Sequence, residues 1–303
     1  MVNINHLIPM KITVSLACSL FVALTALSQL QAQMIHFEAL PSKGGQKSSS
    51  SFVRLNNEGI IATVVELGSD VKKAKLVVGE EKFPIAFMTK DNDSRVAIYK
   101  LPIQAFGAAN QIAELGPSTA ITPSTDVYTS VTDRDTPARI VGRVHRFQGK
   151  VLPLAVFRVN HKDTSPKPGS GIYDSKGKLI ALVRQSVYNE PKSSYCLPIE
   201  VVTRIREDQK RNGRVSRCWI GIIMDDLVAA PIVESVRPDS PAQKAGLKNG
   251  DVILSIGGLP VSEYAQVVDA FYYLIAGEKK KFKVLRGTEI KEFEVIPEVS
   301  PGR

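Results

Sequence analysis

Residues that build metal centres and disulfide scaffolds are scarce in this sequence. Its 303 residues include 3 cysteines, 4 histidines and 1 tryptophan. After the N-terminal segment only His36, His145 and His161 remain, and neither Cys196 nor Cys218 has Cys-x-x-Cys spacing. We therefore expect no metal site and no cofactor. Two alternatives stay open for Cys196 and Cys218: a disulfide that links two domains, or two separately buried thiols.

A concentrated block of basic charge is also missing. The net charge of +9 is spread along the chain, and its short runs are Lys-Lys at 72–73 and Lys-Lys-Lys at 279–281. Aromatic residues do not alternate with these basic ones, so the pattern favours a solvated basic surface and no nucleic-acid partner. The hydrophobic fraction of 44% and the charged fraction of 23% are ordinary for a globular protein, and the length suffices for two domains.

The long apolar run near the N-terminus is short for a membrane span. Lys11 precedes ITVSLACSLFVALTAL, a run of about 16 residues against the roughly 20 that a spanning helix needs. The run ends in the polar SQLQAQ, with Ala32 suited to the last position before cleavage. We therefore predict a signal peptide over 1–32 and an exported protein, periplasmic or secreted, without a membrane span after cleavage. An uncleaved segment would instead anchor the chain to the membrane.

The region after the signal peptide is rich in β-type runs. Residues 33–51 contain SKGGQKSSSS and are predicted to be a flexible lead-in. From 52 to 203, short apolar runs such as GIIATVVEL, RVAIYKL and KLIALV are separated mostly by Gly, Pro, Asn or Asp. This spacing argues for an antiparallel sandwich or barrel. An amphipathic helix is predicted over 199–214, and residues 204–216 are assigned as a linker helix.

The second domain, predicted over 217–300, contains a distinctive run, PDSPAQKAGLKNGDVILSIGGLPV. Pro241 suits a helix start, Gly246 and Gly250 allow a tight reversal, and Asp251 leads into an apolar strand. WIGI precedes this run, and a helical pattern over 262–275 follows it. The segment resembles a PDZ domain of the bacterial high-temperature-requirement (HtrA) type.

This resemblance implies a peptide-binding groove. In such domains a loop of backbone N–H groups holds the C-terminal carboxylate of a partner, which adds as a strand beside the following helix. The positions that match the loop are Trp219, Ile220, Gly221 and Ile222. Val268 and Phe271 are the helix positions expected to face the groove, although plain core packing is an equal alternative for both.

The order of a β-rich exported domain, a helix and a PDZ domain resembles the HtrA/Deg family of serine proteases. The resemblance implies a mainly β fold, with a chymotrypsin-like double β-barrel domain followed by the PDZ domain. Three segments of the first domain carry the resemblance. The segment before the catalytic histidine is matched by FVRLNNEGIIATVVEL, and the segment with the catalytic aspartate is matched by KFPIAFMTKDNDSRVAIYKL. The nucleophile loop is matched by SPKPGSGIYDSKGKLIALV.

The positions of the catalytic triad carry the wrong residues. The histidine position falls on Glu66 or, in a second alignment, on Val65; the aspartate position falls on Arg95. A serine is a poor nucleophile without a histidine to take its proton, and a guanidinium cannot orient an imidazolium. The gapless match puts Pro168 at the nucleophile, and a deletion would be needed to bring Ser170 there. Pro168 also removes an N–H of the kind that forms an oxyanion hole.

No replacement triad is evident from the sequence. His161, Asp163 and Ser170 are close in sequence, but His161 and Asp163 alternate on an extended segment without facing a serine. We therefore predict a catalytically inactive HtrA-like protein that binds peptide C-termini or unfolded segments through its PDZ domain. The alternative is an active serine endopeptidase with an unorthodox site. A third hypothesis is an assembly subunit, in a homo-oligomer or a mixed oligomer with an active paralogue.

Overall fold

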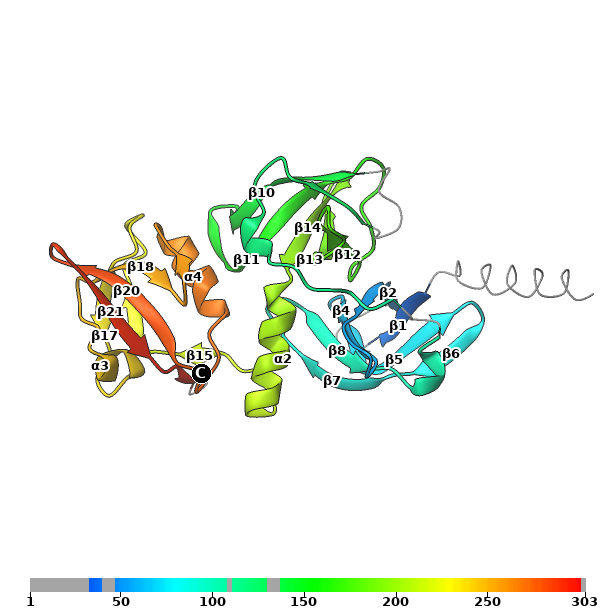
Figure 1. Ribbon diagram of the computed structural model, residues 1–303, viewed down its shortest axis with the longest axis horizontal. Coiled ribbons are helices and arrows are strands. Elements are labelled where there is room, and N and C mark those ends of the chain that lie inside the picture. Colours follow the sequence, from blue (N-terminus) through cyan, green and yellow to red (C-terminus); the bar gives the residue numbers. More distant parts are fainter. Residues whose placement is uncertain (1–32, 40–46, 108–110, 130–136, 301–303) are drawn as a thin grey trace, which may run out of the picture.

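The computed structural model is mainly β and consists of two β lobes, a long helix and a smaller β domain (Figure 1). It describes residues 33–39, 47–107, 111–129 and 137–300. The expected signal peptide, 1–32, lies outside the described residues. Among the residues that are described, no helix is both long and apolar enough to cross a membrane.

The first lobe is built from two antiparallel four-stranded sheets. One has the order β2-β1-β5-β6 and comprises β1 (Gln33–Ala39), β2 (Ser48–Ser50), β5 (Ser69–Val78) and β6 (Glu81–Pro84). The other has the order β3-β4-β8-β7 and comprises β3 (Phe52–Arg54), β4 (Ile60–Val64), β7 (Ala86–Lys90) and β8 (Val96–Lys100). β4 is buried along its whole length because its two faces serve two cores. Ile61 packs inside the lobe, whereas Ala62 and Val64 pack toward the second lobe.

The segment expected as a flexible lead-in differs from that expectation. β1 pairs with both β2 and β5, and its residues Ile35 and Phe37 are buried in the first lobe. The two apolar side chains alternate with the exposed His36, which is the period of a half-buried strand. This short signal was hidden beside the Gly- and Ser-rich run at 42–51, so the lobe begins earlier than residue 52.

The second lobe is a six-stranded antiparallel sheet in the order β12-β13-β14-β11-β10-β9. Its strands are β9 (Asp126–Val127), β10 (Ala138–Phe147), β11 (Lys150–Asn160), β12 (Gly171–Tyr173), β13 (Leu179–Val187) and β14 (Glu190–Pro198). Short 3₁₀ turns at Ile103–Ala105 and Ser118–Ala120 lie on the chain between the lobes. Ile140, Phe157, Ile172 and Val183 are among the residues that form the core of this lobe. The long β10–β11 hairpin extends beyond this core.

Helix α2 (Glu200–Asn212) closes the interface between the two lobes. Val201, Val202 and Ile205 are buried in the same apolar cluster as residues of both lobes. The helix ends at Gly213, which has φ +69° and donates its N–H to the Gln209 carbonyl. It therefore begins earlier than the linker helix expected at 204–216 and packs on the lobes as part of their core.

The C-terminal domain has the expected order of strands and helices. It comprises β15 (Cys218–Trp219), β16 (Ile222–Met224), β17 (Val233–Val236), α3 (Pro241–Ala245), β18 (Val252–Ile256), β19 (Leu259–Pro260), α4 (Tyr264–Tyr272), β20 (Lys280–Arg286), β21 (Glu289–Val295) and β22 (Glu298–Val299). The buried Ser240 caps α3 by accepting the Gln243 N–H at 3.2 Å, and Pro241 occupies the first turn. Gly246 ends the helix at φ +93°. The predicted roles of Pro241 and Gly246 are therefore confirmed.

Candidate functional site

The two residues predicted for the position of a catalytic histidine, Val65 and Glu66, lie just after β4. The side chain of Val65 is fully buried in the core of the first lobe, whereas that of Glu66 is exposed. Only the alignment that assigns the histidine position to Glu66 therefore puts the side chain outside the core. Val65 donates its N–H to the Arg95 carbonyl at 3.0 Å, so the histidine and aspartate positions are side by side.

Arg95, at the aspartate position, points toward the second lobe. Its Nη2 donates to Oε1 of Gln185 on β13 at 2.6 Å. Burial and the neighbouring Arg184 lower the pKa of Arg95, and Glu66 opposes that shift. Arg95 has φ +66°, a left-handed conformation that is uncommon for a residue other than glycine. A guanidinium thus bridges the lobes at the position that the sequence comparison predicted for the catalytic aspartate.

The segment that resembles a nucleophile loop is held by both lobes. Pro168 accepts the Ser51 N–H at 2.8 Å, and Gly169 donates its N–H to Val183 at 2.8 Å. Gly169 has φ +85°, and a Cβ there would lie 2.1 Å from the Ser51 carbonyl oxygen, so this close approach requires glycine. Ser170 donates its N–H to Lys167 and accepts from Val183. The loop keeps a fixed shape, with Pro168 at its centre.

Two of the described histidines have partners away from Ser170, and the third is exposed to solvent. His161 is buried, and its Nε2 is hydrogen-bonded to Ser194 Oγ at 2.7 Å. The partner of His161 is therefore Ser194 and not Ser170. His145 lies 3.9 Å from a carboxylate of the C-terminal domain. His36 is exposed on β1. None of these three imidazoles is hydrogen-bonded to Ser170 within the part of the chain that the structure describes.

The loop of the C-terminal domain that was predicted to bind carboxylates has its carbonyl groups engaged within the domain. Ile220 accepts the Ala242 N–H at 2.9 Å, and Gly221 accepts the Arg237 N–H at 2.8 Å. Within the described chain, the N–H groups of Ile220 and Gly221 make no backbone hydrogen bond. Gly221 has φ +79°, and a Cβ there would lie 3.0 Å from the Trp219 ring, so the indole lies against the loop.

A free strand edge follows this loop. β16 pairs with β17 on one side, and the other edge of β16 has no strand partner among the described residues. Ile222 packs partly on the core of the domain. On α4, Val268 is half-buried, and the Phe271 ring lies 6.5 Å from the buried Phe282 ring. Phe271 therefore contributes to the core, whereas Val268 is not part of that apolar cluster.

The part of α4 that carries Asp269 and Tyr272 docks on the barrel domain, a contact that no local pattern in the sequence predicts. Asp269 is buried, and its carboxylate accepts from Arg143 Nη2 at 2.7 Å and from the Ala155 N–H at 2.8 Å. The Tyr272 hydroxyl donates to Asp91 at 2.9 Å. Asp91 also accepts from Ser94, directly before the aspartate position, so α4 is bonded to the loop that carries it.

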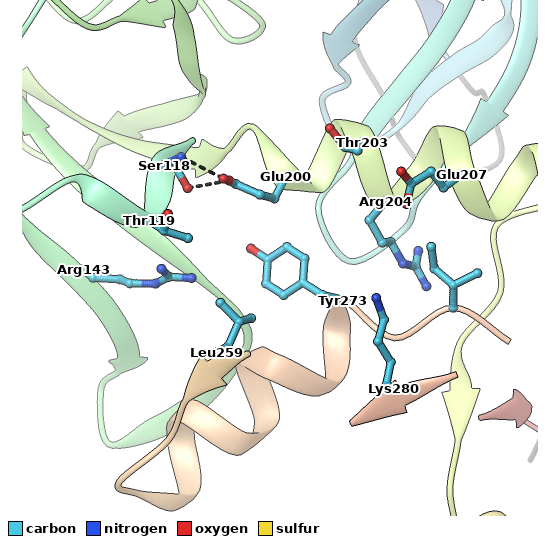
Figure 2. Close-up of a pocket in the computed structure, with 11 residues that line it drawn as sticks. Ser118, Thr119, Arg143, Glu200, Thr203, Arg204, Glu207, Leu259, Tyr273 and Lys280 are labelled. Atoms are coloured by element: carbon cyan, nitrogen blue, oxygen red, sulfur yellow. Dashed lines mark hydrogen bonds between the residues drawn. The ribbon is translucent and has the colours of Figure 1, made fainter. Parts of the chain in front are cut away.

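A cavity of about 220 Å³ lies where α2, the second lobe and the C-terminal domain meet (Figure 2). Glu200 enters it from α2 and accepts two hydrogen bonds from Ser118. The Tyr273 side chain extends into the same space, and burial raises the pKa of its hydroxyl. The three cations that line the cavity already have carboxylate partners: Arg143 with Asp269, Arg204 with Asp91 and Asp208, and Lys280 with Glu278. The cations of this junction between domains are thus already paired.

Comparisons with known proteins agree with this architecture. A family model described as "PDZ domain" matches residues 218–296. A "Probable periplasmic serine endoprotease DegP-like" of Marinomonas sp. (strain MWYL1) is 24% identical over 288 residues, which are 88% of this chain and 60% of that protein. A protein of the same description from Pseudomonas putida (strain W619) is 32% identical over 168 residues, 49% of this chain and 35% of its own length. The chain thus spans at most about 60% of the length of these relatives.

Solved structures show the same fold. The "HtrA-type protease AlgW with tripeptide" superposes with a TM-score of 0.61 at 18% identity, covering 93% of this chain and 98% of that one. The "serine endoprotease from Yersinia pestis" gives 0.53 at 18% identity, covering 91% and 97%. The fold is therefore a chymotrypsin-like double β-barrel followed by a PDZ domain, and the predicted fold class is confirmed. The chain is thus similar to DegP-like and HtrA-type serine proteases and contains a PDZ domain.

Proposed function

We propose that this protein is an exported, non-proteolytic member of the HtrA type that binds peptide C-termini or unfolded segments through its PDZ domain. The observation that carries the proposal is the loop at 166–170. In serine proteases of this fold, the oxyanion is bound by the N–H groups of the nucleophile residue and of the residue two before it. Here those positions are Pro168 and Pro166, and proline has no N–H.

The other two triad positions support the same conclusion. Glu66 and Arg95 replace the general base and the residue that orients it, and both would have to change for a serine to be activated. Burial lowers the pKa of His161, and its Nε2 is bonded to Ser194, so it is not positioned to serve as an alternative base. The scaffold would then hold and present the PDZ domain.

Among the described residues, one edge of β16 has no strand partner and the N–H groups of Ile220 and Gly221 make no backbone hydrogen bond, and both features support peptide binding. An extended peptide can pair with such an edge while its terminal carboxylate accepts from the loop. Val268 and the partly buried Ile222 offer apolar contact for the last side chain, which favours hydrophobic C-terminal residues. The periplasm is the proposed location, because the relatives are described as periplasmic.

Two further proposals concern organisation. We propose the barrel domain over 52–203, extended by the strands within 33–51, and the PDZ domain over 217–300. Assembly into a homo-oligomer, or into a mixed oligomer with an active paralogue, is tested by size measurement of the chain alone and mixed with such a paralogue. A strict monomer that never co-elutes would exclude both assemblies.

Proteolysis is tested with unfolded casein and the purified chain. We expect no cleavage above that of the Ser170→Ala variant, which serves as the matched control. Cleavage that disappears in Ser170→Ala would overturn the proposal and establish the alternative, an active endopeptidase.

Peptide binding is tested on the full chain with its own fluorescence, because Trp219 is the only tryptophan and lies in the loop. Titration with a peptide ending in a free hydrophobic residue should change the Trp219 emission. Hydrogen bonds to a charged group are worth about 1.5–3 kcal/mol each, so the amidated peptide should bind at least about tenfold more weakly. Val268→Glu should weaken binding, and Val141→Glu, on the exposed part of β10, should leave it unchanged. Equal affinity for free and amidated peptides would refute the role of the loop.

A further inference from the structure

A second cavity, of about 180 Å³, lies beside the position of the catalytic aspartate. The long β10–β11 hairpin covers it, and β13 and β14 form the other walls. Its apolar lining consists of Val144, Phe147, Leu152, Val156 and Tyr195. The rings of Phe147 and Tyr195 meet edge to face at 6.5 Å, so two aromatic side chains shape one wall.

The polar side of this cavity is formed by Arg184 and Gln185. Gln185 accepts the hydrogen bond from Arg95, which brings a second guanidinium to the same place. Arg184 donates through Nη2 to the Asp93 carbonyl. The Nε atoms of both arginines are buried and have no acceptor among the described residues. Of these two arginines with an unused Nε donor, Arg184 lines the apolar cavity and Arg95 is hydrogen-bonded to Gln185, which lines it.

The carboxylates near these arginines are largely committed to other cations. Asp93 accepts two hydrogen bonds from Arg217, at 2.5 and 3.1 Å. Asp91 accepts from Tyr272 and lies 3.7 Å from Arg204. Glu66 lies near Arg95 but is exposed, so solvent weakens its attraction to the Arg95 guanidinium. The two guanidinium groups repel one another, and an additional anion would relieve that repulsion.

We propose that this cavity binds a small apolar carboxylate, an arylalkanoate or a short fatty acid. Its carboxylate would accept from Arg184 and Arg95, and its apolar group would fill the space between Phe147, Leu152 and Tyr195. Guanidinium groups match a carboxylate in charge and geometry, and the walls exclude an ion that is polar all round. The inference goes beyond peptide binding by the PDZ domain: Arg95, at the predicted position of the catalytic aspartate, would contribute to binding a small ligand.

The test is calorimetric titration of the full chain with 3-phenylpropionate and with its neutral isostere, 3-phenylpropionamide. The acid should bind, and the amide should bind at least about tenfold more weakly, because the charge-assisted hydrogen bonds are lost. Arg184→Gln should weaken binding of the acid by a similar factor. Arg139→Gln, which removes an exposed arginine from the same lobe, should bind as the unchanged chain does. Equal binding of acid and amide, or wild-type affinity in Arg184→Gln, would overturn the proposal.

A second variant and the emission of Trp219 distinguish binding in this cavity from misfolding and from binding at the PDZ domain. If Arg184→Gln does not fold, Gln185→Glu takes its place; it puts a carboxylate at the cavity beside Arg95 as a counter-ion, and should lose binding while keeping the fold. Wild-type affinity in that variant would refute the site. The emission of Trp219 is followed in the same titration. If it changes with the calorimetric signal, the acid occupies the PDZ loop, and the proposed cavity is wrong.

Discussion

Replacement of Asp269 by alanine should release the PDZ domain from the barrel domain. The Asp269 side chain is 8% exposed and accepts from Arg143 at 2.7 Å and from the Ala155 N–H at 2.8 Å. Ala155 is fully buried, so its N–H would be left without an acceptor, at about 1–3 kcal/mol. Arg143 is 30% exposed and regains some water, which moderates the loss of the ion pair. We expect a total loss of about 3 kcal/mol of docking free energy.

The assay is urea unfolding followed by two signals. Emission of Trp219 reports on the PDZ domain, and far-ultraviolet circular dichroism reports on all the strands. The two transitions should coincide in the unchanged chain and separate in Asp269→Ala, with the PDZ domain unfolding at lower urea. Asp269→Asn keeps an acceptor for Ala155 and should show about half the effect.

The matched control for this prediction is Asp226→Ala, an exposed aspartate of the same domain. Its stability should remain within about 0.5 kcal/mol of the unchanged chain. If Asp269→Ala also remains within that range, with coincident transitions, the reasoning that this carboxylate docks the PDZ domain is refuted.

Three more predictions concern the barrel domain and the thiols. Gly169→Ala should lower the Tm by at least about 5 °C, because its Cβ would meet a backbone carbonyl at 2.1 Å and a positive φ; an unchanged Tm contradicts this. Burial lowers the pKa of His145 and His161, so the unfolded chain binds more protons and the free energy of unfolding should fall as the pH drops below about 6.5. In urea titrations from pH 7 to 5, the free energy of unfolding of His161→Gln should decrease less than that of the unchanged chain. An identical pH profile for the two chains would contradict this prediction. Burial raises the pKa of Cys196 to about 12 and of Cys218 to about 11, so both thiols should be unreactive toward a thiol reagent at pH 8 in the folded chain. Both should react once the chain is unfolded in the absence of a reductant. If neither reacts in the unfolded chain, the two cysteines form a disulfide.

The C-terminal domain could be predicted from sequence because its signals are local. Pro241, Gly246 and Gly250 fix the helix start and the tight reversals through their own backbone preferences, and the structure places α3 and β18 where these residues indicate. The β-rich character of the barrel followed in the same way from short apolar runs and their turn residues. The strand β1 was missed because only Ile35 and Phe37 carry its pattern.

The sequence by itself determined what stands at the predicted triad positions: residue 66 has no imidazole, residue 95 has no carboxylate and residue 168 has no amide N–H, whatever the fold does. The tertiary structure alone decided which side chains meet. Arg95 and Gln185 are 90 residues apart, and Asp269 and Arg143 are 126 apart, so no local preference specifies either pair. Such contacts depend on how sheets and domains pack, because burial and charge pairing are properties of the assembled core. For this reason the docked PDZ helix and the arginine-lined cavity emerged only from the fold.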